Sequence, residues 1–384
     1  MRCRNCNSHS LEILNSIESI EQKVLTSDAQ ELKNVKATRT LCSNCACIEV
    51  HYMPEDRLKT YFREGYNISD TVQDNLIVHR NNSVNKHTYI IDNLSNLLNK
   101  LSSRGIFLEI ACGRGKLVRF FQDKYPQWKC YGIDPSVESP SNYTKRSNKV
   151  TFIRDYFETK YFQGMAFDVV VAHGFLNRSP TLPELLKIRS CCRKGTLLSL
   201  EFLVLDNSVF TPYIWDHSFM YMMDVFEVYL KHAGFISIAN VDCVSSYHYL
   251  CECRADAKPL SGIVIEDNKV KETKKLFYKH IEWWQELKKN YKRSGLSKPD
   301  KEYGLFGAGL YNAIFLQLIR EQKFAWVVDE VKHGGRFFSL PVIGLREAKD
   351  KKNGQVLICA RPEYINVIKN KLSNNKISHL VMNP

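Results

Sequence analysis

Residues 106–134 decide the fold: IFLEIACGRGKLVRFFQDKYPQWKCYGID. An apolar run ends at Ile110, glycines at 113 and 115 allow a tight turn, and the spacing predicts an amphipathic helix from Lys116. Glycines let the backbone approach a ligand that side chains would exclude, and the start of the helix offers free N–H groups. The next strand ends at Asp134, whose carboxylate can accept both hydroxyls of a ribose. The stretch therefore predicts a nucleoside-binding site.

Two classes of nucleoside-binding domain share this pattern. A dinucleotide site needs a third glycine, and Val118 takes that position. The run E-x-A-C-G-R-G instead resembles the first motif of class I methyltransferases, which implies S-adenosylmethionine as the cofactor. A nucleotide-binding fold without activity is the other interpretation. The resemblance implies one acidic residue beneath the turn and a second that binds the ribose. It also implies an acidic and an aromatic residue near the adenine, and a fourth strand whose end faces the methyl group. The cofactor residues expected are Glu109, Gly113, Gly115, Asp134, Asp155, Tyr156 and His173.

Strands and helices alternate outward from this stretch. The apolar runs FLEIA, KCYGID, VTFIR, FDVVVA and TLLSLEF are separated by helical or turn segments, and FISIANV and YLCECRA follow. This alternation predicts a doubly wound α/β domain with a mostly parallel sheet. Composition changes near residues 255–262, and a basic helix leads into a second, smaller Rossmann-like α/β unit. We expect a zinc-binding module at 1–70, the methyltransferase domain at 71–257, and the helix with the second unit at 258–384.

Four cysteines near the N-terminus form two C-x-x-C pairs. Each two-residue gap lets the backbone offer both sulfurs to one ion, so Cys3, Cys6, Cys42 and Cys45 are predicted to bind Zn²⁺ tetrahedrally. Four protein ligands leave no open position for a substrate, which favours a structural role over a catalytic one. Cys47 is an additional thiol with the wrong spacing for a knuckle with Cys42.

The order of these three parts, with the segment LSLEFLVLDNSVFTPYIWDHSFMY, resembles the nucleotide-sugar C-methyltransferases of deoxysugar biosynthesis. Those enzymes methylate a carbon beside the ketone of a dTDP-4-keto-deoxysugar. The resemblance implies that His217 is the catalytic base that forms an enolate, that Asp216 supports it, and that Tyr66 lies over the site. An imidazole titrating near neutrality suits this proton transfer. From the residues alone, a capping or surface histidine in a loop between strand and helix is the favoured interpretation of His217, and the resemblance reverses this order.

Several neighbours of the expected base depart from the family pattern. Ile214 and Trp215 replace a tyrosine and a histidine, and Arg178 stands where a histidine usually follows the fourth strand. The methylated atom therefore has alternatives to carbon: the enzyme could methylate a nitrogen or an oxygen of a sugar nucleotide or of another small metabolite. The substrate-binding residues expected are Glu201, Arg178, Tyr221, Lys332, His333 and Arg336.

The C-terminal unit repeats the strand, glycine turn and acid of the first site. Gly304, Gly307, Gly309 and Asp329 are candidates for nucleotide contact, although close packing explains the glycines equally well. In the resembling enzymes this unit helps hold the sugar nucleotide. Lys332, His333 and Arg336 are the better candidates for phosphate contacts.

Composition limits the other classes of function. The chain has 384 residues, 44% of them hydrophobic, and no apolar run approaches the ~20 residues that span a bilayer. The N-terminus lacks the apolar core of a secretory signal, so we expect a cytoplasmic protein with reduced thiols. We also expect a monomer or weak dimer that has no membrane partner. A net charge of +13 favours anionic partners. A zinc-containing RNA methyltransferase is an alternative, but nucleic acid is disfavoured because the lysines near 269–301 fit a solvated helix face.

Overall fold

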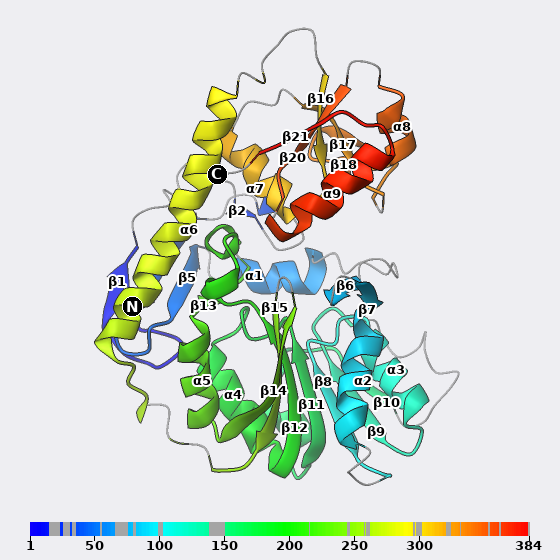
Figure 1. The fold of residues 1–384 in the computed structure, drawn as a ribbon. Coiled ribbons are helices and arrows are strands. Elements are labelled where there is room, and N and C mark those ends of the chain that lie inside the picture. The colour runs from blue at the N-terminus through cyan, green and yellow to red at the C-terminus, as the bar shows by residue number, and fades with distance from the viewer. Residues whose placement is uncertain are drawn as a thin grey trace. The chain divides into compact units, whose positions relative to one another are not determined.

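The structure is a computed structural model, shown in Figure 1. It describes residues 1–14, 24–25, 31–32, 36–53, 56–65, 76–79, 82–98, 103–137, 150–214, 216–243, 246–256, 258, 262–294, 296, 302–319, 324–330, 332–351, 354–360 and 362–382.

The chain divides into two compact units. The first contains Met1–Asn15, Val35–Thr211 and Asp216–Lys274, and the second contains Ser16–Asn34, Pro212–Trp215 and Lys275–Pro384. The division falls inside helix α6 (Asp267–Arg293). The cysteine-bearing segment, expected to be a domain of its own, shares the first unit with the sheet that follows it.

A seven-stranded sheet is the centre of the first unit. Its strand order is β10-β9-β8-β11-β12-β15-β14, and the five strands from β10 to β12 are parallel. β15 is antiparallel to β12 and to β14. The chain runs outward from β8 through β9 to β10 and then returns to build β11 and β12 on the other side, which makes a switch point at the carboxyl end of β8. In chain order the strands are β8 (Ile106–Ile110), β9 (Lys129–Ile133), β10 (Val150–Ile153), β11 (Phe167–His173), β12 (Cys192–Phe202), β14 (Phe235–Cys243) and β15 (Ser246–Cys253).

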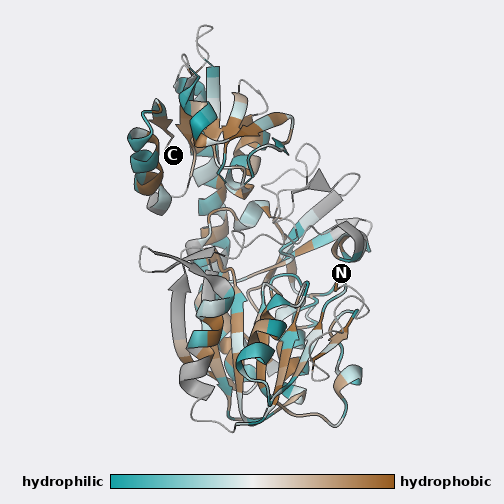
Figure 2. Ribbon diagram, turned by 90° about the vertical axis from the view of Figure 1, so that its right-hand side faces the viewer, coloured by the Kyte–Doolittle hydropathy of each residue, from teal (hydrophilic) through white to brown (hydrophobic). Residues whose placement is uncertain are grey.

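Helices cover both faces of this sheet, as its continuous apolar runs require. Along β11, Val169 and Val171 belong to one buried cluster, while Val170 and Ala172 belong to another. Because successive strand side chains point to opposite faces, each cluster lies on its own side of the sheet. One is closed by α2 (Lys86–Leu98) and α3 (Lys116–Lys124), and the other by α4 (Thr181–Ser190) and α5 (Met223–His232). Figure 2 shows the resulting contrast between brown strands and helices that are largely teal.

The cysteine-bearing segment forms a second sheet within the same unit. Its order is β1 (Leu11–Ile13), β4 (Lys36–Cys42), β5 (Ile48–Met53) and β13 (Phe219–Met220), all antiparallel. The four cysteines also belong to the buried cluster that packs against α4 and α5. The N-terminal segment is thus completed by a strand from far along the chain. Shorter elements complete the unit: the ribbon β6 (Leu76–His79)-β7 (Asn82–Asn85), α1 (Arg57–Thr60), and single turns at Tyr61–Gly65, Thr159–Phe162 and Leu205–Asn207. The ribbon β2 (Val24–Leu25)-β3 (Glu31–Leu32) belongs to the second unit, and the turn at Thr211–Tyr213 lies at the division between the units.

The second unit has a six-stranded sheet of its own. Its order is β18-β19-β17-β16-β20-β21, parallel except for the edge strand β18. The strands are β16 (Glu302–Phe306), β17 (Phe324–Val328), β18 (Arg336–Phe337), β19 (Leu340–Ile343), β20 (Gly354–Ile358) and β21 (His379–Val381); the helices are α7 (Leu310–Ile319), α8 (Leu345–Lys349) and α9 (Pro362–Asn374).

The prediction of a doubly wound α/β fold with a mostly parallel, Rossmann-like sheet is confirmed. The expected strands, the helix after the glycine turn and the long basic helix are all present. In the described part of the chain, the helices are too short or too polar to cross a membrane.

Two adjacent phenylalanines in α3 test the packing of this helix on the sheet. Phe121 is fully buried and stacks on Phe107 with ring centroids 4.1 Å apart, whereas Phe120 is 51% exposed. Phe121→Ala should lower the free energy of unfolding by about 3–5 kcal/mol, because it leaves a cavity in the core. Phe120→Ala, the matched control, should change it by less than about 1 kcal/mol. Urea unfolding followed by circular dichroism measures both; equal effects would contradict this packing.

Candidate active site

A cavity of about 960 Å³ opens at the carboxyl ends of the parallel strands in the first unit. Its lining includes the loop ends after β8, β9, β10 and β11, the start of α4, and residues from the N-terminal segment and β13. In an open α/β sheet this edge is where ligands bind. Of the residues predicted at the cofactor, those on the cavity wall are Glu109, Gly113, Asp134, Asp155, Tyr156 and His173.

The glycine turn after β8 requires its glycines. Gly115 has φ +71°, and a Cβ there would lie 2.2 Å from a ring carbon of Phe152. Gly113 also has a positive φ, and its backbone N–H donates to Oδ2 of Asp134 at 2.9 Å. The turn therefore stays open toward the cavity and is tied to the end of the neighbouring strand.

Two acids organise the turn. The carboxylate of Glu109, almost buried, accepts a hydrogen bond from the backbone N–H of Val118 at 3.1 Å and so holds the first turn of α3. Asp134 accepts from Gly113 through Oδ2 and, at 2.7 Å, from the backbone N–H of Ser136 through Oδ1. Asp134 is thus part of the frame of the site as well as its predicted ribose acceptor. The turn, the open helix end and the acid fit an adenosine-bearing cofactor.

Asp155 and Tyr156 extend the same wall beyond β10. The carboxylate of Asp155 accepts from the Tyr161 hydroxyl and, at 2.8 Å, from the backbone N–H of Tyr156. These bonds, that from Tyr161 first, lower the pKa of Asp155, so the group is an anion at neutral pH. The hydroxyl of Tyr156 donates to the backbone carbonyl of Lys59 at 2.7 Å.

His173 and its neighbours lie at the end of β11. Nε2 of His173 is 2.9 Å from Oγ of Ser199, and Nδ1 is 3.9 Å from Oε2 of Glu201, which β12 places opposite it in register. Arg178 also lines the cavity, and its Nε lies 3.4 Å from the buried carboxylate of Asp216. The structure therefore joins four predicted residues in two pairs, His173 with Glu201 and Arg178 with Asp216, and the first member of each pair lines the cavity.

His217 and Tyr221 do not line this cavity, although Ser218 and Phe219 between them do. Burial lowers the pKa of His217 to about 4, and Asp216 only partly opposes this effect. Within the described residues, Nδ1 of His217 is buried without a hydrogen-bond partner. Tyr221 is fully buried against Phe226, and burial raises the pKa of its hydroxyl. Tyr66 lies outside the described residues.

The four predicted zinc ligands converge. The sulfurs of Cys3, Cys6, Cys42 and Cys45 lie within 4.8 Å of one another, and all four residues are buried. The Cys3–Cys45 and Cys6–Cys42 sulfur distances are 3.7 and 3.6 Å. Four sulfurs placed tetrahedrally at about 2.3 Å from one Zn²⁺ are separated by roughly 3.8 Å, so the cluster has the size that the ion requires.

The cavity residues that were not anticipated from the sequence include three charged residues from separate segments. Arg4 stands between two metal-ligand candidates, Lys59 precedes the sheet in an unremarkable segment, and Glu184 lies in the first turn of α4. Burial raises the pKa of Glu184 to about 7. From the sequence, a charged residue in a helix is normally predicted to face solvent. Only the tertiary structure shows that the side chain of Glu184 is buried.

The remaining substrate-binding candidates belong to the second unit. Lys332, His333 and Arg336 are exposed after β17, and each contacts a backbone carbonyl: those of Ala308, Glu330 and Ser339. Asp329 accepts from the backbone N–H groups of Ala308 at 2.8 Å and Lys332 at 3.0 Å. This acid ties a glycine turn to the next strand, as Asp134 does in the first unit.

Residues 83–249 match a family described as a methyltransferase domain. Similar solved structures include magnesium protoporphyrin IX methyltransferase from Synechocystis PCC 6803 with bound SAH, at 14% identity over 52% of this chain and 98% of that chain, with a TM-score of 0.38. The 1,6-didemethyltoxoflavin-N1-methyltransferase of Burkholderia thailandensis is 16% identical over 42% of this chain and 76% of that chain, with a TM-score of 0.35. An O-methyltransferase family protein from the same organism is 15% identical over 45% of this chain and 58% of that chain, with a TM-score of 0.35. The match therefore spans little more than half of that protein. No curated protein matches the chain.

The domain match covers the glycine turn and the acidic strand ends described above. The match therefore identifies a methyltransferase domain within residues 83–249, which is less than half of the chain.

Two glycines with the same backbone conformation test the turn. Gly115→Ala should abolish measurable binding of S-adenosylhomocysteine, because the new methyl collides with Phe152 and must displace the turn. Gly164 has φ +75° and open space around it, so Gly164→Ala should cost only the ~1–2 kcal/mol of a left-handed backbone and leave binding intact. Isothermal titration calorimetry distinguishes them. Unaltered binding by Gly115→Ala would place the cofactor elsewhere.

Glu184 should impose a pH dependence on stability. With its folded pKa at about 7, the folded protein holds a proton that the unfolded chain releases near its ordinary value of 4.5. Between these pH values the folded state binds more protons, so the free energy of unfolding falls as pH rises from 4.5 to 7. Glu184→Gln should remove this part of the slope, and the exposed Glu266→Gln should not. Urea midpoints at pH 5 and pH 8 measure it; an unchanged slope in Glu184→Gln would refute the assignment.

Proposed function

We propose that the protein transfers a methyl group to a small molecule, and that the acceptor is a nucleotide-linked keto sugar methylated at carbon. The observation that carries methyl transfer is one cavity with the cofactor motif on one wall and His173, Arg178 and Glu184 beyond it. The choice of acceptor rests on the resemblance of the whole chain: two cysteine knuckles, a methyltransferase domain and a second α/β unit.

In this proposal the residues at the ends of β8, β9 and β10 would hold the cofactor. The glycine turn would contact it through backbone atoms, Asp134 would accept hydrogen bonds from the ribose, and Asp155 with Tyr156 would face the adenine. When bound, the cofactor supplies an electrophilic methyl on a sulfonium. The protein contributes alignment and electrostatics, because transfer needs the acceptor atom in line with the methyl.

His217 is the proposed base. Its neutral imidazole would take the proton from the carbon beside the ketone, and the electron pair of that C–H bond would form an enolate, the nucleophile for the methyl group that the cofactor would supply. Burial keeps this imidazole neutral at pH 7, but it also lowers the pKa of His217 to about 4, below the value near neutrality expected from the sequence for a general base. Its neighbour Asp216 is tied to Arg178 on the cavity wall, which couples the base to the site. His173 lies on the cavity wall itself and is the second candidate.

A structural Zn²⁺ in the cysteine cluster completes the proposal. The ion would join Cys3 and Cys6 to Cys42 and Cys45, stabilising a segment whose described sheet is small. Amide groups support the sulfurs: Nδ2 of Asn5 lies 3.6 Å from Cys45 and Nδ2 of Asn44 lies 3.7 Å from Cys6. Such outer contacts are typical of thiolate ligands.

The base assignment is tested with purified protein, S-adenosylmethionine and a panel of 4-keto nucleotide sugars. Mass spectrometry should detect a product heavier by one methylene. His217→Ala should lower kcat by about 10²–10⁴-fold, the usual contribution of a general base. The exposed His9→Ala is the control. Without cofactor, the wild type should also exchange the α proton for deuterium.

A fully active His217→Ala variant would overturn this assignment, and His173→Ala, made in parallel, then tests the second candidate. If no keto sugar is methylated, hydroxyl- and amine-bearing sugar nucleotides are the next acceptors to try.

The metal proposal predicts one zinc per chain with four sulfur ligands at about 2.3 Å, measurable by X-ray absorption. Cys42→Ser should lose the metal and lower the thermal midpoint, because the ion's binding energy stabilises the fold. Cys47→Ser removes a nearby buried thiol outside the cluster and should keep it. A zinc-free wild type, or retention by Cys42→Ser, would contradict the site.

A further inference from the structure

The two residues between the first pair of cysteines contact the methyltransferase domain. Oδ1 of Asn5, fully buried, accepts a hydrogen bond from the backbone N–H of Leu182 at 2.8 Å, in the first turn of α4. Its neighbour Arg4 lines the cavity, as does Glu184 on α4. The first knuckle is therefore a part of the cavity wall and is fixed to the helix beside it.

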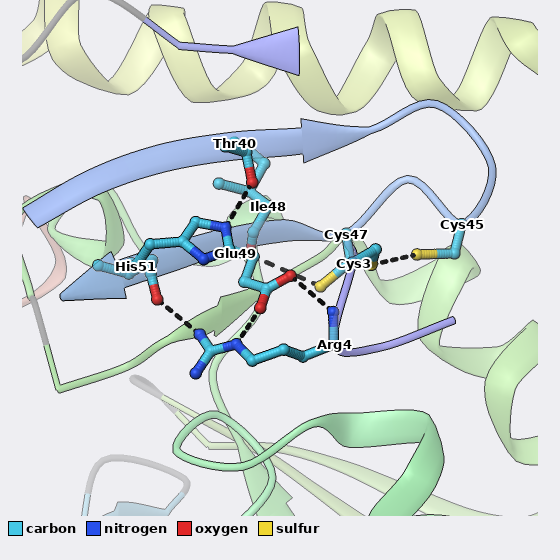
Figure 3. Close-up of polar contacts among 9 residues, drawn as sticks. Cys3, Arg4, Thr40, Cys45, Cys47, Ile48, Glu49 and His51 are labelled. Atoms are coloured by element: carbon cyan, nitrogen blue, oxygen red, sulfur yellow. Dashed lines mark hydrogen bonds and ion pairs between the residues drawn. The ribbon is translucent and has the colours of Figure 1, made fainter. Parts of the chain in front are cut away.

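Arg4 is held in one orientation (Figure 3). Its backbone N–H donates to Oε2 of Glu49 at 3.1 Å, its Nε donates to Oε1 of the same carboxylate, and Nη2 donates to the carbonyl of Val50 at 2.6 Å. The guanidinium also lies 5.0 Å from the ring centroid of Phe219. Because the side chain of Glu49 is completely buried, it cannot move to follow another partner.

These contacts leave part of the guanidinium available. A guanidinium carries five N–H donors, and Nε and Nη2 use only some of them. Among the described residues no contact involves Nη1, and 35% of the side chain is exposed. A planar, oriented guanidinium edge is the preferred partner of a carboxylate or a phosphate.

We infer that Arg4 is a specificity-determining residue that binds an anionic group, phosphate or carboxylate, of the methyl acceptor. The cofactor motif lies at the ends of β8, β9 and β10, whereas Arg4 lines the cavity with Ser218 and Phe219 from a different part of the chain. Only the identity of the bound molecule as a methyl acceptor rests on the proposed function.

A purely structural role for Arg4, neutralising Glu49, makes a different prediction. Arg4→Gln alone would leave a buried carboxylate without its cation and could unfold the segment. The informative pair is therefore Glu49→Gln and the double variant Arg4→Gln/Glu49→Gln. Both lack the buried charge and both keep an amide at position 49, so they differ only in the guanidinium.

The test measures anion binding to protein saturated with S-adenosylhomocysteine, which occupies the cofactor's own carboxylate site. Inorganic pyrophosphate and malonate are titrated separately by calorimetry, so that the two arms distinguish a phosphate from a carboxylate. At least one anion should bind the wild type and Glu49→Gln. It should bind the double variant about 10- to 100-fold more weakly, the effect of losing hydrogen bonds to a charged group. Arg2→Gln, at an exposed position next to the same knuckle, is the control.

Equal anion affinity in Glu49→Gln and the double variant would overturn the inference, as would a wild type that binds neither anion. Metal content and thermal midpoint, matched between the two variants, exclude loss of the knuckle as the cause. Binding of S-adenosylhomocysteine in the first step reports on the proposed function separately, since it uses none of these residues.

Discussion

The hydrogen bonds of Asp134 are the constraint on which the site depends. This carboxylate ends β9, holds the glycine turn after β8 through Gly113, and holds its own loop through Ser136. Two adjacent strand ends are thereby fixed relative to each other before any ligand binds. Preorganised dipoles and charges act in catalysis without having to rearrange during the reaction. The same arrangement recurs at Asp329 in the second unit, so both sheets position their first turn in one way.

The parts of the molecule governed by local rules were predictable. Continuous apolar runs predicted the strands, and residues 106–134 indicated the glycine turn, the acid and a nucleoside ligand. The cysteine spacing likewise indicated a cluster that the structure brings together. In these segments the chemistry is carried by residues near one another in the chain, so a short window contains the whole signal.

The cavity wall beyond the cofactor motif could not be predicted in this way. Arg4 and Glu184 come from two distant segments, and nothing in their own neighbourhoods indicates that they share a wall. His217 is the opposite case. Its sequence motif predicted a site residue, but tertiary packing buries its side chain outside the cavity lining. Long-range placement depends on how sheets and helices close around each other, which periodicity does not encode.

The pairing of β5 with β13 has a consequence for how the chain is made. Glu49 pairs with Phe219, so the sheet that carries the second cysteine knuckle is incomplete until most of the first unit has left the ribosome. Contacts between such distant positions slow folding, because the loop entropy is lost before the contact is gained. During synthesis the cysteines emerge first but their sheet closes late. A metal bound early would hold this segment compact through the interval in which its final edge strand has yet to be translated.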